Sequence, residues 1–188
     1  MIIGRNSQQY LLQLARKCLL YFFETGEEYM LAAEEVPEEL KSESATFVTL
    51  TKFGQLRGCI GRLEATQMLY LDVIEHSYAA AFSDYRFEPL LMEELQDIRI
   101  EISILSVPKK LEYQDASDLI VLLEQQRPGV ILSDDLHQAT FLPQVWEELS
   151  DPKAFLDNLC LKARLERNAW EKGHIQISTY TVQNFMES

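Results

Sequence analysis

The chain has 188 residues, of which 47% are hydrophobic and 25% charged, values that are ordinary for a globular protein with its own core. Thirty acidic residues against 17 basic ones give a net charge of −13, which disfavours nucleic acids and anionic membrane surfaces as partners. The three cysteines lie far apart, and neither a signal peptide nor a membrane-length apolar run is visible, so we expect a cytoplasmic protein in a reducing compartment.

The first half of the chain shows helical stretches around a pair of strands. Apolar residues recur at helical spacing from Leu11 to Phe22, and Gly26 ends that stretch. Two strands joined by a short turn then predict a β-hairpin. The predicted elements are a helix from Asn6 or Ser7 to about Phe23, an acidic loop over 27–44, strands over Ala45–Lys52 and Leu56–Leu63, a helix from Thr66 to about Phe82, and a helical turn over Leu90–Gln96.

The second half opens on the clearest strand of the chain. Over Ile98–Ile104 four isoleucines alternate with polar residues, so one face of this strand is predicted to lie in the core. Asp115 and Asp151 each precede a helical stretch, as N-capping residues do. The further predicted elements are a helix from Asp115 to about Gln126, strands over Val130–Ser133 and Gln138–Leu142, a helical segment over Gln144–Leu149, a helix from Asp151, and a final strand over Ile175–Val182.

The order of these elements predicts the fold class. It runs α, ββ, α, β, α, ββ, α, β, whereas a doubly wound parallel sheet needs regular alternation of strand and helix. We therefore expect an α+β fold with a mostly antiparallel or mixed sheet. A chain of this length suits one domain, or two closely packed lobes.

The run Leu56–Gly61, with the sequence LRGCIG, is the most distinctive segment. If its leucine and isoleucine face the core, Arg57, Cys59 and Gly61 lie on the opposite face of the strand. A guanidinium beside a thiol favours the thiolate, and a glycine within a strand marks close approach of a ligand or of backbone. The functional interpretation is a site with Cys59 as the catalytic residue and with Arg57, Gly58 and Gly61 binding a ligand. The alternative is tight packing around a small cysteine, and no base for a cysteine nucleophile is evident.

Three charged residues outside this run are further candidates for ligand binding. Asp84 and Arg86 lie in an extended connection after a helix, where charges are often functional but are also typical of any solvated loop. Glu101 lies on the polar face of the isoleucine-rich strand, and its charge must be paired if that face is covered. A cross-strand pair between Glu101 and Arg57 is one arrangement that the sequence allows.

Several other kinds of site are disfavoured. His76, His137 and His174 show none of the spacings that bind metals, and we interpret them as surface histidines or as hydrogen-bonded core histidines. Glycine-rich nucleotide loops, a serine-hydrolase elbow and a convincing pair of acids are missing from the sequence. We therefore predict no metal site, and the sequence does not indicate whether the protein binds a cofactor.

The chain resembles the AMMECR family, and most closely its prokaryotic branch, the AmmeMemoRadiSam system protein A. The run Leu56–Gly61 matches the family hallmark without change. One departure is Asp84-Tyr85-Arg86, where Asp-Pro-Arg is more usual. The resemblance continues, in order, through Ala79–Phe87, Ile100–Ser106, Ala139–Trp146, Leu159–Ala163 and Ala169–Trp170.

The resemblance implies an α+β fold of two unequal lobes within a single domain over residues 1–188. In this interpretation an N-terminal helix and loop, over about 1–44, precede a family-like core over about 45–185. The family implies no established reaction, although its hallmark is proposed to be functional. Members are encoded beside a Memo-like protein and a radical SAM protein, so both are expected as partners.

Two hypotheses for the function follow. In the first, the chain is a small cytoplasmic enzyme or accessory subunit that acts with these partners on a small metabolite or a protein side chain. Arg57 then binds an anionic group, Cys59 supplies a thiolate, and Asp84, Arg86 and Glu101 line the site, so Arg57→Ala is expected to leave the fold intact. In the second hypothesis the chain is a non-catalytic binding or adaptor module, and the hallmark is a folding element.

Overall fold

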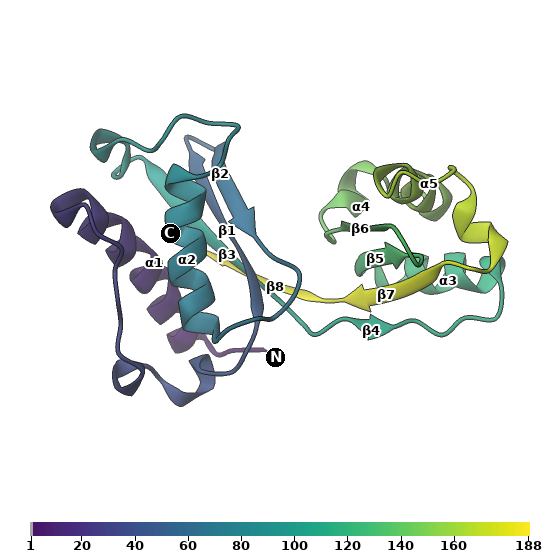
Figure 1. Cartoon of the computed structure of the whole chain (residues 1–188), viewed down its shortest axis with the longest axis horizontal. Coiled ribbons are helices and arrows are strands. Elements are labelled where there is room, and N and C mark those ends of the chain that lie inside the picture. The colour runs from purple at the N-terminus through teal and green to yellow at the C-terminus, as the bar shows by residue number, and fades with distance from the viewer. Residues whose placement is uncertain (1) are drawn as a thin grey trace. The chain divides into compact units, whose positions relative to one another are not determined.

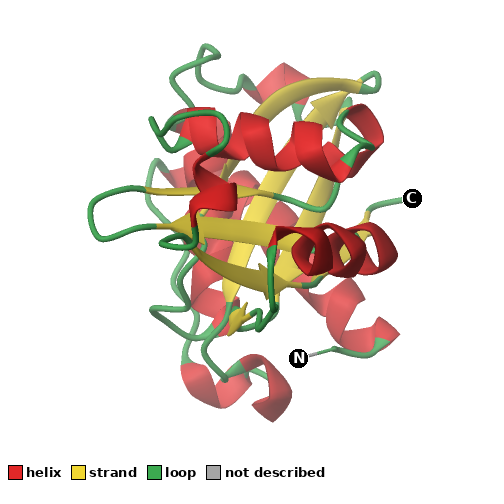
Figure 2. Ribbon diagram, turned by 90° about the vertical axis from the view of Figure 1, so that its right-hand side faces the viewer, coloured by secondary structure: helices red, strands yellow, loops and turns green. Residues whose placement is uncertain are grey.

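A computed structural model describes residues 2–188 (Figure 1). It divides into two compact units, Met1–Val107 with Gln183–Ser188 (unit 1) and Pro108–Val182 (unit 2). Each unit has its own four-stranded sheet and its own helices, which Figure 2 shows in yellow and red. The α+β fold class is thereby confirmed.

Unit 1 combines its sheet with two long helices. The strand order is β2-β1-β3-β8, and β1 pairs antiparallel with both β2 and β3. The elements are α1 (Arg5–Thr25), η1 (Ala33–Glu35), η2 (Glu38–Leu40), β1 (Ala45–Lys52), β2 (Gln55–Gly61), α2 (Leu69–Phe82), η3 (Met92–Glu94), β3 (Ile98–Leu105) and β8 (Val182–Met186).

The core of unit 1 lies between the sheet and the helices α1 and α2, which share one side of the sheet in Figure 1. The four isoleucines of β3 are each 3% exposed or less, which confirms the predicted core face of this strand. Because side chains alternate along a strand, the residues between them point to the opposite face of the sheet, which we call the distal face. Thr49 of β1 and Glu101 of β3 belong to the distal face.

Unit 2 packs helices on a second sheet of strand order β4-β7-β5-β6 with antiparallel pairing throughout. The side chains of Asp115 and Asp151 accept backbone N–H groups of the helices that follow them, which confirms both predicted helix starts. In the core the Trp146 ring stacks on the Phe155 ring, with 3.7 Å between centroids. The elements are β4 (Lys109–Lys110), α3 (Ala116–Gln126), β5 (Gly129–Ser133), β6 (Gln138–Phe141), α4 (Val145–Glu148), α5 (Pro152–Lys162), η4 (Ala169–Lys172) and β7 (Gln176–Tyr180).

Two element predictions need correction. The final predicted strand, Ile175–Val182, ends earlier: residues 176–180 form β7 in the sheet of unit 2, and a separate strand that begins at Val182, β8, belongs to the sheet of unit 1. An alternating pattern reports the two faces of a strand but not the sheet that it joins, so the sequence does not reveal this division. The two-residue strand β4 was not predicted at all. Within residues 2–188, no helix is long and apolar enough to cross a membrane.

Candidate functional site

The hallmark run forms most of β2, which is an edge strand of the unit 1 sheet. Leu50 of β1 lies opposite Gly58, but the next residue of β1 lies opposite Leu56, so Arg57 is the extra residue of a β-bulge. The bulge breaks the expected alternation of the strand. The condition that both Leu56 and Ile60 face the core holds only for Ile60: Leu56 is 44% exposed, and Gly58 is buried against α2.

The two hallmark glycines make room for the protein's own atoms. A Cβ atom on Gly58 would lie well inside van der Waals contact with the carbonyl oxygen of Ala80 in α2. A Cβ atom on Gly61 would overlap the carbonyl oxygen of Thr46 and the ring of Phe47. At both positions the atoms that approach closely belong to the protein itself. These contacts favour the interpretation that the two glycines serve tight packing.

The Arg57 guanidinium holds the segment after α2 against β2. Its Nε and Nη2 lie 3.0 and 2.7 Å from the two carboxylate oxygens of Glu94, and it also donates to the carbonyl oxygens of Glu88 and Pro89. Lys52 Nζ lies 3.0 Å from the same carboxylate. The hydrogen bond from Arg57 is the main reason that the pKa of Glu94 falls to about 2. Arg57 thus pairs with Glu94, and the cross-strand pair with Glu101 is not formed.

Asp84 and Arg86 occupy the open edge of β2. Asp84 Oδ2 accepts the Cys59 N–H at 2.9 Å, and Arg86 Nη2 donates to the Cys59 carbonyl oxygen at 3.2 Å. The two side chains also pair with each other, at 2.7 Å between Nη2 and Oδ2. The hydrogen bond from Arg86 is the largest cause that holds the pKa of Asp84 well below its usual range. We call this arrangement the edge clamp, because it satisfies backbone groups that an edge strand otherwise leaves open.

A row of three polar side chains crosses the distal face of the sheet. Thr49 lies directly opposite Cys59 in β2 and directly opposite Glu101 in β3, and directly opposite residues share a face. Thr49 Oγ1 donates a hydrogen bond to Cys59 Sγ at 3.2 Å. Glu101 is half-buried, and no hydrogen bond or ion pair to its side chain is found among residues 2–188. We call Cys59, Thr49 and Glu101 the polar row; it offers a thiol, a hydroxyl and a carboxylate on one surface.

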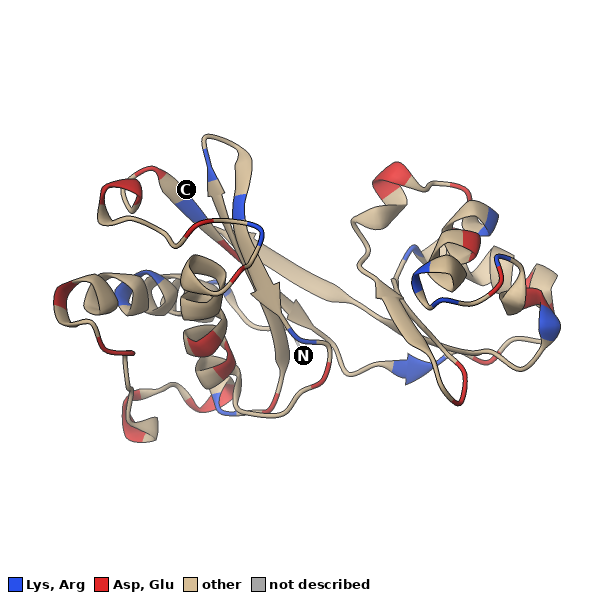
Figure 3. Cartoon of the chain, turned by 45° about the horizontal axis from the view of Figure 1, so that its top comes forward, with Lys and Arg blue, Asp and Glu red and all other residues tan. Residues whose placement is uncertain are grey.

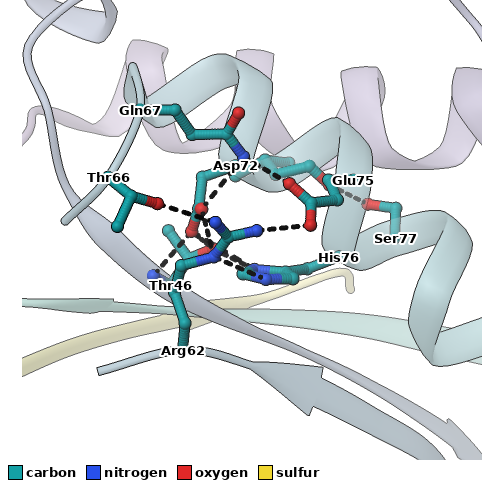
Figure 4. A network of polar contacts seen from close by, with 9 residues as sticks. Thr46, Arg62, Thr66, Gln67, Asp72, Glu75, His76 and Ser77 are labelled. Carbon is teal, nitrogen blue, oxygen red and sulfur yellow. Dashed lines mark hydrogen bonds and ion pairs between the residues drawn. The ribbon is translucent and has the colours of Figure 1, made fainter. Parts of the chain in front are cut away.

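A separate polar network lies between α2 and β1 (Figure 4). The fully buried Asp72 accepts hydrogen bonds from the backbone and hydroxyl of Thr46, and its Oδ1 lies 3.0 Å from Arg62 Nε. Burial alone raises the pKa of Asp72, but the hydrogen bonds from His76 and Thr46 bring it below its ordinary value. Arg62 Nε lies 3.2 Å from His76 Nε2, and because a guanidinium can only donate, Nε2 accepts and Nδ1–H faces Asp72.

Sequence reasoning identified only one residue of this network. His76 was predicted as a surface or hydrogen-bonded core histidine, and it is 3% exposed with partners on both ring nitrogens. Asp72 was missed, although its spacing of four residues from His76 puts both side chains on one face of a helix. Since its buried groups all have partners, we interpret the network as a link between β1, α2 and the end of β2.

The remaining candidates for chemistry differ in burial. Burial raises the pKa of the Cys18 thiol to about 12 and also raises that of Cys160, whereas Cys59 is half-buried. Across residues 2–188, no three His, Cys, Asp or Glu side chains converge on a point where they could hold a metal ion. The polar row is therefore the strongest candidate for a functional site.

Comparisons with known proteins agree on one family. The AMMECR1 family model matches residues 12–185. A protein of Methanopyrus kandleri is 34% identical, with 95% of this chain and 87% of the relative covered, and a protein of Methanothermobacter thermautotrophicus is 32% identical, with 98% and 96% covered. The crystal structure of an uncharacterized protein from Pyrococcus horikoshii is similar, with a TM-score of 0.86 at 28% identity over 99% of this chain and 94% of that one.

Proposed function

Because the chain belongs to the AMMECR1 family, we propose that it is an accessory protein that binds a small metabolite or a partner's side chain at the polar row. In this proposal Glu101 receives a donor group of the ligand, such as an amine or an amide. Cys59 and Thr49 contact the adjacent atoms of the same ligand.

The observation that carries the proposal is the unpartnered carboxylate of Glu101. A half-buried charge without a partner costs free energy that a ligand's hydrogen-bond donor can offset. Among residues 2–188 no such donor contacts Glu101, while Thr49 lies directly opposite it on the same face and Cys59 lies on the far side of Thr49. A ligand that binds here is therefore expected to carry at least one N–H or O–H group.

The contacts of the hallmark favour an accessory role over that of a self-contained catalyst. Arg57 is engaged by Glu94, and Asp84 and Arg86 are engaged by each other and by the Cys59 backbone. In the proposal these three charged residues position β2 and do not themselves bind the substrate. The family resemblance supplies the expected partners, a radical SAM protein and a Memo-like protein acting with this chain in the cytoplasm.

The proposal is tested with the purified chain and the purified radical SAM and Memo-like proteins of the same organism. Biolayer interferometry should detect binding to at least one of them. Glu101→Gln should weaken that binding about tenfold, since charged hydrogen bonds contribute roughly 1.5–3 kcal/mol. Glu124→Gln, which changes an exposed carboxylate on α3, serves as the matched control. Equal affinities for the two variants, or no binding to either partner, would reject a partner's side chain as the ligand of the polar row.

The hydrogen bond from Thr49 to the Cys59 sulfur supports a second candidate, an enzyme in which Cys59 is the nucleophile. A hydroxyl that donates to sulfur stabilises the thiolate over the thiol. The test is the rate of Cys59 alkylation against pH, read by peptide mass spectrometry, in the wild type and in Thr49→Val. A midpoint well below the ~8.5 of a free thiol, raised by the substitution, supports a nucleophile. A midpoint near 8.5 in both proteins contradicts it.

A further inference from the structure

The edge clamp contacts the backbone of β2 in the way that a neighbouring strand does. In an antiparallel ladder a residue directs its N–H and its C=O to the same side. At Cys59 both groups point to the open edge of β2, where the N–H donates to Asp84 and the carbonyl oxygen accepts from Arg86. One residue of an added strand would make the same two hydrogen bonds, with its carbonyl oxygen in place of the carboxylate and its N–H in place of the guanidinium.

Side chains, and not a backbone ladder, hold the connection between α2 and η3 against this edge. Among residues 2–188, no backbone-to-backbone hydrogen bond joins the connection, 83–91, to β2. Figure 3 shows that the connection passes beside the sheet of unit 1 and carries both red and blue segments. Besides the clamp, Arg57 reaches out from β2 and donates to the carbonyl oxygens of Glu88 and Pro89. The backbone groups of Cys59 are therefore closed by two charged side chains.

The open edge of β2 is complementary to itself at Cys59. In a two-fold symmetric dimer the same surface of both copies meets, so an antiparallel pair of β2 strands can place Cys59 opposite its equivalent. The two residues would then exchange both hydrogen bonds, with about 5.5 Å between their Cα atoms. Directly opposite side chains share a face, and disulfides span Cα separations of about 4.4–6.8 Å. Such a pair of strands can therefore be trapped by a disulfide between the two Cys59 thiols.

We propose that the edge clamp blocks strand addition at β2, and that a chain without the clamp pairs through β2 with a second copy of itself. Open N–H and C=O groups of an edge strand are a template for another strand, and proteins commonly protect them with charged side chains. Asp84 is only 5% exposed, and its carboxylate is shared between the Cys59 N–H and Arg86. This role of Asp84 and Arg86 does not depend on ligand binding at the polar row.

Disulfide trapping of the full chain carrying both Asp84→Ala and Arg86→Ala tests the proposal. Diamide oxidises two thiols to a disulfide and takes up their two protons and two electrons. We expect the double variant to form a dimer linked through Cys59 at least about tenfold faster than the wild type, because paired strands raise the local concentration of the second thiol. Non-reducing electrophoresis measures the dimer, and peptide mass spectrometry identifies the linked cysteines. The matched control combines Glu166→Ala with Lys172→Ala, which removes an exposed ion pair of unit 2.

Sedimentation equilibrium supplies a second readout that needs no oxidant. With Cys59→Ser added, the double variant should still shift from 21.8 kDa toward twice that mass as its concentration rises, because backbone groups make the contact. If circular dichroism shows that the double variant is unfolded, Arg86→Ala alone takes its place with the same expectation, since that side chain is 44% exposed.

Two results would overturn the proposal. The first is a folded clamp variant that stays monomeric and forms the Cys59 disulfide no faster than the wild type. The second is a dimer linked through Cys18 or Cys160, because these cysteines are buried and their linkage would mean that the variant associates through unfolding and not through β2.

Discussion

Replacement of Gly58 by alanine tests the packing role of the hallmark. The added Cβ atom would lie 3.1 Å from the carbonyl carbon of Ala80 and closer still to its oxygen. Both are backbone atoms of α2, which cannot rotate away as a side chain can, so β2 or α2 must shift as a whole. Overpacking of a core typically lowers the free energy of unfolding by about 1–3 kcal/mol. Because the added atom meets rigid backbone, we expect Gly58→Ala to lie at the upper end, at about 3 kcal/mol.

Urea unfolding and thermal unfolding, followed by circular dichroism, measure this effect. In a chain of this size each kcal/mol lowers the unfolding temperature by about 2–4 °C, so we expect a decrease of roughly 6–12 °C. Gly4→Ala is the control, because a Cβ atom there meets nothing within 4 Å. An alanine at this N-cap should cost less than about 1 kcal/mol. If Gly58→Ala were as stable as the control, the glycine would have to be explained by a ligand and not by packing.

Three further predictions concern the residues around the hallmark. Arg57→Ala should lower the free energy of unfolding by about 2–3 kcal/mol, because it removes charge-assisted hydrogen bonds and leaves Lys52 as the partner of Glu94. Urea unfolding measures this change. An unchanged urea midpoint would instead support the expectation from the sequence that the fold stays intact. Glu94 has its pKa lowered to about 2, so its contribution to stability is present above the ordinary value of 4.5 and is lost as pH falls toward 2. The wild type should lose more stability over that interval than Glu94→Gln, in which the other carboxylates of lowered pKa, such as Asp84, still titrate. Acid-unfolding curves that run parallel would contradict this. Iodoacetamide should label native Cys59 before Cys18 and Cys160, which are buried. Labelling of all three cysteines at the same rate, read by peptide mass spectrometry, would contradict this difference in burial.

Local patterns in the sequence were sufficient for most elements. The strand Ala45–Lys52 was predicted with the bounds that the structure shows, because its β-branched residues and the following turn are both local signals. The helix α2 begins at Leu69, three residues later than predicted from Thr66, as is usual for helix boundaries without a side-chain cap.

The candidate site was less predictable, because its geometry depends on contacts between distant segments. Period-two alternation put Arg57 and Cys59 on one face, but the bulge at Arg57 turned its guanidinium to Glu94. Only strand pairing brings Glu101 and Cys59 to the two sides of Thr49.

By itself the sequence determined the α+β class, the core face of β3 and the hallmark as the segment of interest, because periodicity, caps and turns act between residues close in the chain. Tertiary structure alone decided which charges are neutralised within the protein. Asp84 and Arg86 close the edge of β2, Arg57 is held by Glu94, and Glu101 has no partner among the described residues 2–188. These outcomes depend on strand register and on which distant segments of the chain fold back beside the sheet. A side chain's partner is set by the strands that lie beside each other and not by its neighbours in the sequence.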